Sequence, residues 1–417
     1  MGAGRSDASM KFLRQLGIPS RLNRGNQDDW RVRPRRPASA TFRLAIGWLT
    51  LFLVGTDLFI VSPLLPTIAR HFVVPPSTAG WAVTVFALAY AIGSPLWGSR
   101  ADHVGKRAVI ILGLIGFSAG NFLTSQVPTF GLFLGTRMMS GVSTAAVVPA
   151  IYAVIGDIAP VAHRGRWLSL VGSGLLMSLW AGAPLATVIA HAVGWQAIFL
   201  GLSLGSTLLV FANGVAWPAR AVHATASPSP ILVTVPIPWR RLLADVAITG
   251  GWALAVYGFY TYLGTGLERL DHLSTDRVAT ILVAYGIGAT VGSLTGGRLA
   301  DRFGSQRIAT IGLFGLGGLL VLIGYFFRVS WLLYGLMGCF AMLAYAFFPA
   351  FQSFLAARYP DRRGLIMAWN NAALYSGIAL GAWLGGRVIS RWPFSVLPIM
   401  CGVLALLVGL VIQRQNT

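Results

Sequence analysis

One acidic and one basic side chain lie inside long apolar stretches of this sequence. Asp57 falls in the apolar stretch near residues 43–67, and Arg137 falls in the one near residues 129–155. An ionised group deep in a bilayer is costly, and by default it marks a proton or ion pathway. A carboxylate beside a cation whose distance changes can load and release a proton. We therefore predict that Asp57 and Arg137 are a proton-coupling pair, with a static ion pair that fixes helix packing as the alternative.

The two charges are expected at similar depth. Asp57 follows Arg43 by 14 residues, which is about 21 Å of helix in an apolar core about 30 Å thick. Arg137 follows Thr129 by 8 residues, which is about 12 Å of helix entering from the other face. Asp157 and Asp245 are expected at cytoplasmic helix ends, where a charge is less costly. Asp57 is thus the one acid predicted deep in a span.

The composition requires a membrane protein. The chain has 417 residues, of which 55% are hydrophobic and 11% are charged, whereas soluble proteins carry about 25% charged residues. This excludes a soluble enzyme, a disordered chain and a disulfide-rich secreted domain. Lipid admits only helices and closed barrels, and strand-like alternation is absent, so the predicted fold class is an all-α membrane protein. We place its twelve transmembrane helices near residues 43–67, 78–98, 108–126, 129–155, 166–191, 195–217, 243–266, 275–297, 306–327, 330–354, 364–387 and 394–412.

Polar segments divide the chain. Residues 1–42 are predicted to be a disordered, Arg-rich cytoplasmic tail, and residues 218–242 a cytoplasmic linker between six-helix halves at 43–217 and 243–417. With the N-terminus inside, inside segments hold 25 Lys and Arg residues and outside loops hold six. Positive residues favour the cytoplasmic side, so both termini are predicted to be cytoplasmic. The net charge of +20 lies in short loops, which favours a topology signal over nucleic-acid binding.

Two loops repeat the same pattern 199 residues apart. The pattern follows the second and the eighth apolar stretch, and a third match at the same offset pairs residues 163–165 with 362–364. Such a repeat implies two halves related as parallel repeats. The repeated loops contain Gly98, Asp102, Gly105, Lys106 and Arg107 in the first copy and Gly297, Asp301, Arg302, Gly304 and Arg307 in the second.

The first of these loops resembles the signature loop of the major facilitator superfamily. Residues 55–66 are similar to the first helix of its twelve-helix drug:proton antiporters, and residues 137–141 to that branch's Arg-x-x-x-Gly element. Residues 182–184 resemble the antiporter element, although Ala186 stands where a second glycine is usual. Asn370 and Asn371 resemble helix 11 of the sugar- and chloramphenicol-efflux subgroup. The resemblance implies the major facilitator fold.

The signature loops are interpreted as a gate. Gly98 would let the second and eleventh helices approach closely, and Asp102 would accept hydrogen bonds from a helix N-terminus or an arginine in the inward-closed state. Asp301, with Arg302 and Arg307, would serve the other half in the same way. The alternative is ordinary turn chemistry combined with the positive-inside signal.

Two further sets of residues are interpreted by their position. Small residues and a proline in the fifth span, at Gly174, Gly182 and Pro184, predict a close-packed antiporter-type interface, with ordinary membrane-helix packing as the alternative. Polar and aromatic residues in three later spans predict a wide cavity for amphiphilic substrates, with packing aromatics as the alternative. The cavity residues are Tyr257, Tyr260, Gln352, Asn370, Asn371 and Tyr375.

The sequence contains no motif for several common kinds of catalysis and cofactor binding. The sequence lacks a phosphate-binding loop, metal-ligand spacing and a nucleophile elbow, so we expect no cofactor, no metal and no enzyme activity. We predict an inner-membrane, proton-coupled secondary transporter that exports small amphiphilic molecules or drugs by alternating access. Its expected partners are lipid, protons and a small-molecule substrate, and a monomer is the default. An uptake symporter or uniporter and a non-transporting sensor are the alternatives.

Overall fold

The computed structural model describes residues 39–160, 163–218, 239–270 and 275–414. The tail predicted at 1–42 and the linker predicted at 218–242 therefore lie almost entirely outside the described residues. The first half of the described chain is helical throughout. Its elements are α2 (Ala40–His71), α3 (Pro76–Ala79), α4 (Trp81–Val104), α5 (Lys106–Gln126), α6 (Phe130–Ile158), α7 (Arg164–Met177), η2 (Ser178–Gly182), α8 (Ala183–Val193) and α9 (Trp195–Ala216).

The second half is built in the same way. Across the described residues, twelve helical stretches are long and apolar enough to cross a membrane, as the all-α prediction requires. The elements of the second half are α10 (Trp239–Thr261), α11 (Leu263–Glu268), α12 (Thr275–Phe303), α13 (Ser305–Phe326), α14 (Ser330–Arg358), η3 (Pro360–Arg362), α15 (Arg363–Arg391) and α16 (Val396–Arg414).

Glycines end several helices with little connecting chain. Gly105, Gly194 and Gly304 have φ angles of 94°, 91° and 95°, a left-handed region that glycine enters without a steric penalty. Gly105 and Gly304 are 199 residues apart and occupy the same place in the two repeated loops. The two halves therefore turn between their second and third helices with the same backbone conformation.

Two predicted spans are interrupted. The stretch predicted at 166–191 consists of α7, the π-helix η2 and α8. Pro184 explains the wide turn, because it has no N–H to donate to the carbonyl of Trp180 and its ring clashes with that carbonyl. The stretch predicted at 243–266 breaks at Tyr262, where α10 gives way to α11.

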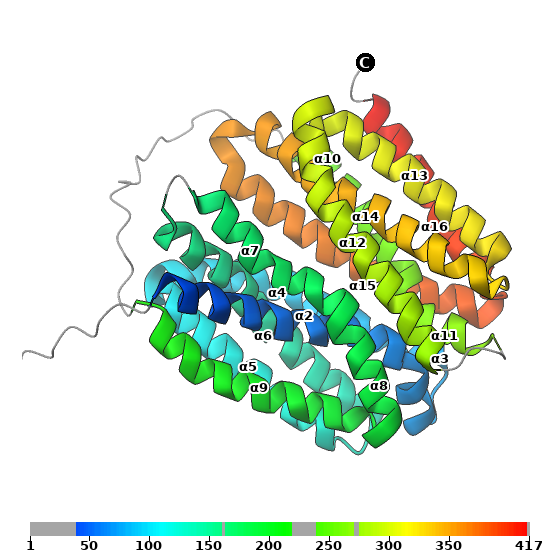
Figure 1. The fold of residues 1–417 in the computed structure, drawn as a ribbon, viewed down its shortest axis with the longest axis horizontal. Coiled ribbons are helices and arrows are strands. Elements are labelled where there is room, and N and C mark those ends of the chain that lie inside the picture. Colours follow the sequence, from blue (N-terminus) through cyan, green and yellow to red (C-terminus); the bar gives the residue numbers. More distant parts are fainter. Residues whose placement is uncertain (1–38, 161–162, 219–238, 271–274, 415–417) are drawn as a thin grey trace, which may run out of the picture. The chain divides into compact units, whose positions relative to one another are not determined.

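The two halves lie side by side within residues 38–417. Figure 1 shows the blue-to-green helices on one side and the yellow-to-red helices on the other. Contacts between the halves join α4 to α15, α2 to α10 and α11, and the segment α7–η2–α8 to α12. Large apolar side chains such as Leu208 and Phe211 are exposed on the surface of α9, as expected of helices that face lipid.

Candidate functional site

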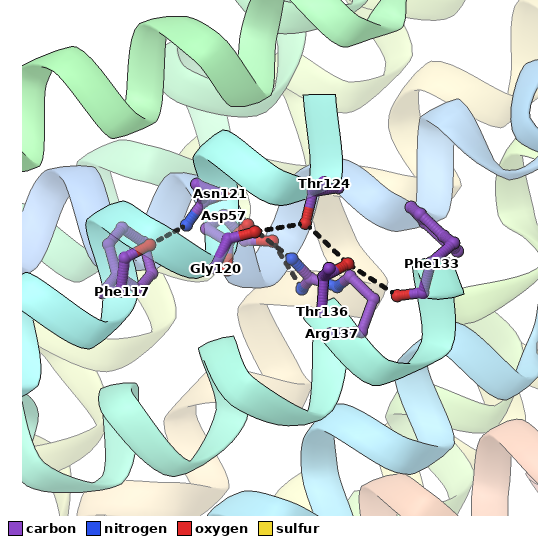
Figure 2. A network of polar contacts seen from close by, with 8 residues as sticks. All are labelled: Asp57, Phe117, Gly120, Asn121, Thr124, Phe133, Thr136 and Arg137. Carbon is purple, nitrogen blue, oxygen red and sulfur yellow. Dashed lines mark hydrogen bonds and ion pairs between the residues drawn. The ribbon is translucent and has the colours of Figure 1, made fainter. Parts of the chain in front are cut away.

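Asp57 and Arg137 form an ion pair in the interior of the first half. Nη1 of Arg137 donates to Oδ1 of Asp57 over 2.7 Å, and Nη2 lies 3.5 Å from the Asp57 carbonyl oxygen. The side chains are 0% and 1% exposed. Figure 2 shows the guanidinium reaching from α6 toward the carboxylate on α2. The structure thus joins the two charges that were predicted from sequence to lie at similar depth.

The pair is incompletely satisfied. Oδ2 of Asp57 and Nε of Arg137 are buried and have no hydrogen-bond partner among the residues that the structure describes. Two aromatic rings confine the guanidinium, whose carbon lies 4.7 Å from the ring centre of Phe86 and 5.7 Å from that of Phe199. A cation over an aromatic face gains about 0.5–2 kcal/mol. The surroundings therefore hold Arg137 in place and leave one carboxylate oxygen of Asp57 unpaired.

Short polar side chains lie around this pair (Figure 2). The Thr124 hydroxyl donates to the Thr136 hydroxyl over 2.9 Å, and Thr136 donates to the Phe133 carbonyl over 2.8 Å. Thr136 precedes Arg137 in α6, so these bonds fix the turn that carries the arginine. Sequence reasoning did not single out Thr124 or Thr136, because a threonine in an apolar span gives no signal until its neighbouring helix is known.

Tyrosine side chains gather at the facing part of the second half. The Tyr257 and Tyr345 hydroxyl oxygens are 3.3 Å apart, and the Tyr285 hydroxyl donates to that of Tyr345 over 3.5 Å. The rings of Tyr260 and Tyr285 stack with centres 4.8 Å apart. We call Tyr257, Tyr260, Tyr285 and Tyr345 the tyrosine cluster. Two of its members, Tyr257 and Tyr260, were predicted from sequence as cavity residues.

The other predicted cavity residues are distributed over α14 and α15. Tyr375 is buried and stacks on Tyr90 of α4 with ring centres 3.5 Å apart. Asn370 is buried and accepts a hydrogen bond of 2.5 Å from Thr249. Asn371 and Gln352 are half-buried. The structure therefore places Tyr375 at the junction of the halves, stacked on the first half.

The halves close against each other at the end where α2 finishes. The Ser62 hydroxyl donates to the Tyr260 carbonyl, and the Tyr260 hydroxyl donates to the Phe59 carbonyl over 3.3 Å. The two bonds run in opposite directions between α2 and α10. They form the inner part of what we call the seal.

Tyr262 forms the outer part of the seal. Its hydroxyl donates to the Ala382 carbonyl over 2.7 Å. A Cβ placed on Gly80 would lie 1.9 Å from that hydroxyl, and one on Gly386 would lie 2.6 Å from it. The tyrosine thus fills a slot between Gly80, which joins α3 to α4 in one half, and α15 of the other half, and only glycines leave this slot wide enough.

An ion pair also joins the halves at this end. Arg70 of α2 pairs with Glu268 of α11, and their side chains are 64% and 44% exposed. Both residues line a pocket of about 370 Å³ that also takes in Thr67, Thr187 and His191. An exposed pair contributes about 0–1 kcal/mol. The buried contacts of Tyr260 and Tyr262 therefore hold the seal, and the ion pair adds little to it.

The opposite end, at Gly105, is arranged differently. Among the described residues, a Cβ on Gly98 or on Gly297 would meet no atom within 4 Å, so these residues show no close helix approach at Gly98. Lys106 pairs with Asp157 within the first half, and Arg107 donates to the Gly214 carbonyl of α9. The signature glycines thus have open space beside them while the seal at the other end is shut.

Of the two signature acids, only the side chain of Asp301 lies among the described residues, and within these it forms no ion pair. The Asp102 side chain lies outside the described residues, although its backbone is helical. Asp301, Arg302 and Arg307 are exposed, and Arg302 lies over the ring of Phe303. A latch at these residues stays a prediction for a different state of the molecule.

The fifth span packs as closely as its small residues predict. A Cβ on Gly174 would lie 2.4 Å from the Trp48 carbonyl oxygen, and one on Gly182 would lie 2.3 Å from the Thr56 hydroxyl oxygen. Pro184 stands in the first turn of α8. Gly174 and Gly182 therefore let the fifth span pack closely against α2, and Gly182 does so at Thr56, directly before Asp57.

Asp245 was expected at a cytoplasmic helix end, where a charge costs little free energy. The structure instead buries its side chain. Its side chain is 1% exposed. Nε of Arg358 lies 3.0 Å from Oδ2 of Asp245, and the Tyr359 hydroxyl donates to the same oxygen over 2.7 Å. Burial, together with the Asp245 carboxylate, raises the pKa of Tyr359 to about 12. Two partners that sequence reasoning missed thus compensate the second buried acid.

Comparison with known proteins identifies the family. The model of the Major Facilitator Superfamily matches residues 47–275 and 266–415. The uncharacterized MFS-type transporter YceJ of Bacillus subtilis (strain 168) is 29% identical over 82% of this chain and 88% of its own. The inner membrane transport protein YdhP of Escherichia coli (strain K12) is 27% identical over 87% and 92%. A chloramphenicol resistance protein of Streptomyces lividans is 25% identical over 62% and 67%.

A solved structure agrees on the fold. The crystal structure of a D-xylose-proton symporter superposes with a TM-score of 0.75 at 17% identity and covers 90% of this chain and 98% of its own. At this identity the similarity concerns the fold alone.

Proposed function

Because the chain belongs to the Major Facilitator Superfamily, we propose that it exports small amphiphilic molecules in exchange for protons. The protein is a multi-pass membrane protein and a secondary transporter of that superfamily. The proposal adds the direction of transport, the coupling ion and the class of substrate. The observation that carries it is the fully buried Asp57–Arg137 pair with its unpaired carboxylate oxygen.

Asp57 is proposed as the proton carrier. A proton on this carboxylate neutralises it and weakens its attraction to Arg137, which changes the balance of charge inside the first half. Oδ2 is the oxygen that can take the proton without breaking the bond to Nη1, because it has no hydrogen-bond partner. Arg137 is proposed to stabilise the deprotonated state, held for this role between Phe86 and Phe199.

The substrate is proposed to bind between this pair and the tyrosine cluster. Tyrosines offer large apolar faces and hydroxyl groups at their tips, which suit molecules that are partly apolar and partly polar. Gln352 and Asn371 are half-buried on the neighbouring helices α14 and α15. The chloramphenicol resistance protein among the relatives supports a drug-like substrate of this kind.

Alternating access is proposed between this structure and one that is open at the seal. The Gly105 end carries the positive loops and is assigned to the cytoplasm, which makes both termini cytoplasmic and this structure inward-facing. In the opposite state Gly98 would let the second and eleventh helices approach closely, and Asp102 would accept hydrogen bonds from a helix N-terminus or an arginine as a latch. Asp301 would serve the other half in the same way. The chain would work as a monomer in the inner membrane.

The test is export of ethidium from a pump-deficient bacterial host at matched expression. Wild-type export that a protonophore abolishes, and that Asp57→Asn also abolishes, is the expected result. Because a lost charge can impair folding, the double variant Asp57→Asn/Arg137→Gln, which leaves no stranded charge, serves as a second inactive form. Full export by Asp57→Asn against a proton gradient would remove the proton assignment. Faster accumulation of ethidium than in cells that lack the protein would reverse the direction and favour uptake.

A further inference from the structure

We propose that the π-helix η2 is the positioning element that ties the protonation state of Asp57 to the placement of Tyr285 in the other half. This inference rests on the proposed function, because it requires that Asp57 exchanges a proton. The five residues Ser178–Gly182 make backbone-close contacts on two sides. One side faces the turn of α2 before Asp57, and the other faces the turn of α12 after Tyr285.

The contact with α2 lies directly before the proton site. A Cβ on Gly55 would lie 2.5 Å from the Ser178 hydroxyl oxygen, and the Cβ position of Gly182 is 2.3 Å from the Thr56 hydroxyl oxygen. Gly55 and Thr56 precede Asp57 in the chain. At each glycine the backbone lies directly against a short side chain of the other element, Ser178 at Gly55 and Thr56 at Gly182. In so close a packing, a displacement of this turn of α2 is expected to displace η2 as well.

The contact with α12 is as close. A Cβ on Gly286 would lie 2.3 Å from Cβ of Trp180 and 2.5 Å from its Cα and N atoms. Gly286 follows Tyr285, whose hydroxyl bonds to Tyr345 and whose ring stacks on Tyr260. The backbone of Trp180 therefore bears directly on the turn that holds a member of the tyrosine cluster.

The π-turn is a suitable element for such coupling. π-Turns inside α-helices are rare and occur frequently at functional sites. Pro184 leaves the Trp180 carbonyl without its helical donor, which frees the backbone between α7 and α8 to adjust. The same residue, Trp180, carries both the freed carbonyl and the contact with Gly286. A small shift of α2 at Asp57 would therefore be transmitted to η2. There the backbone can move without breaking the hydrogen bond that a regular α-helix would form at the Trp180 carbonyl.

Few charged or polar groups act on Asp57 in the described part of the chain. From α6, Arg137 pairs with it. From η2, the nearby polar group is the Ser178 hydroxyl, which donates to the Leu175 carbonyl over 2.6 Å. From α10, the Tyr260 hydroxyl reaches the Phe59 carbonyl on the same helix. A pH response in this region can therefore be checked against Asp57 itself.

The experiment measures whether opening of the seal responds to pH. Spin labels are placed at Leu132→Cys on α6 and Trp331→Cys on α14, after replacement of Cys339 and Cys401. Both labelled positions are well exposed, at 56% and 76%, and begin helices at the sealed end, one in each half. Distances between the labels are measured in nanodiscs at a series of acidic to mildly basic pH values.

Two glycines of α12 provide a matched pair of variants. Gly286→Ala adds a methyl group against Trp180 in the other half, whereas Gly288→Ala adds one at 2.1 Å from the Gly338 carbonyl oxygen within the same half. Both variants strain α12 to a similar degree. The expected result is that Gly288→Ala keeps the pH-dependent change in distance of the wild type and Gly286→Ala loses it. Pro184→Ala, which adds no bulk and removes the cause of the π-turn, is expected to lose it as well.

The outcomes separate this inference from the proposed function. A wild-type response in both Gly286→Ala and Pro184→Ala would overturn the role of η2 while leaving the proton site intact. Equal loss in Gly286→Ala and Gly288→Ala would also overturn it, because general strain in α12 would then explain the result. A wild-type protein without any response, or a response that persists in Asp57→Asn, would remove the proton site of the proposed function and the inference with it.

Discussion

The two halves of the molecule place different kinds of polar side chain in the parts of their interiors that face each other. The first half buries a full ion pair between Asp57 and Arg137, with both side chains at most 1% exposed. The second half places uncharged hydroxyl groups, those of the tyrosine cluster, at the corresponding place. A buried charge responds strongly to a proton, whereas a tyrosine hydroxyl stays neutral and offers area and hydrogen bonds. The difference favours a division of tasks in which one half carries the proton and the other contacts the substrate.

The largest effect is expected from stranding the buried carboxylate. Arg137→Ala should lower the free energy of unfolding by about 3–5 kcal/mol, because the charge of Asp57 would lose its partner inside the fold. Adding Asp57→Asn to this variant should restore much of the loss, since it removes the stranded charge. Reversible unfolding in mixed micelles measures both. A loss below about 1 kcal/mol for the single variant would show that the first half does not depend on buried charge.

Substitution at the seal between the halves should give the next largest effect on stability. Gly80→Ala forces Tyr262 out of its slot, and overpacking of this kind costs about 1–3 kcal/mol. The sealed state should then lose population by about fivefold to a hundredfold. Modification of Leu64→Cys, a buried position, by a membrane-impermeant thiol reagent should become faster.

Gly318→Ala is the control for this substitution, since a Cβ on Gly318 would meet no atom within 4 Å. Its modification rate should equal that of the parent. Equal rates for Gly80→Ala and Gly318→Ala would mean that Tyr262 does not hold the halves together.

The role of the tyrosine cluster is tested by removing one hydroxyl. Tyr345→Phe deletes the group that joins Tyr257 and Tyr285, and each such hydrogen bond contributes about 0.5–1.5 kcal/mol. Ethidium binding should weaken by about threefold to tenfold while the pH dependence of transport stays unchanged. Tyr334→Phe on the same helix is the matched control. A shifted pH profile in Tyr345→Phe would break the proposed division of tasks.

The smallest effect is expected at the exposed ion pair. Glu268→Gln breaks the contact with Arg70, but at their exposure the pair contributes about 0–1 kcal/mol. The transport rate should change by less than about fivefold at low salt. The change should disappear at about 1 M salt, where exposed charges are screened. A larger change that persists at high salt would show that charge at this surface matters as much as charge in the interior.

The fold was accessible from sequence because twelve apolar stretches leave few arrangements in a bilayer. Asp57 and Arg137 were accessible for a related reason, since a charge in an apolar stretch is conspicuous and its depth follows from helical rise. Tyr285 and Tyr345 gave no such signal. A tyrosine in an apolar span is indistinguishable from a packing aromatic until the helices that meet around it are known.

Local backbone and pairing were harder to predict. Pro184 was visible in the sequence, but whether a proline bends a helix or widens one turn depends on the neighbours that accept the shape. Asp245 was predicted at a helix end where a charge costs little free energy. Its burial could not be predicted, because its partners, Arg358 and Tyr359, lie more than a hundred residues away in the chain. The close approach expected at Gly98 depends on the conformational state, which a sequence does not specify.

The central claim is that Asp57 carries the exchanged proton. The direct measurement uses proteoliposomes with a pH-sensitive dye inside, in which an ethidium gradient drives transport. We expect proton movement opposite to ethidium for the wild type and none for Asp57→Asn or Asp57→Asn/Arg137→Gln, both of which should still bind ethidium. Proton movement at the wild-type rate in either variant would contradict the account.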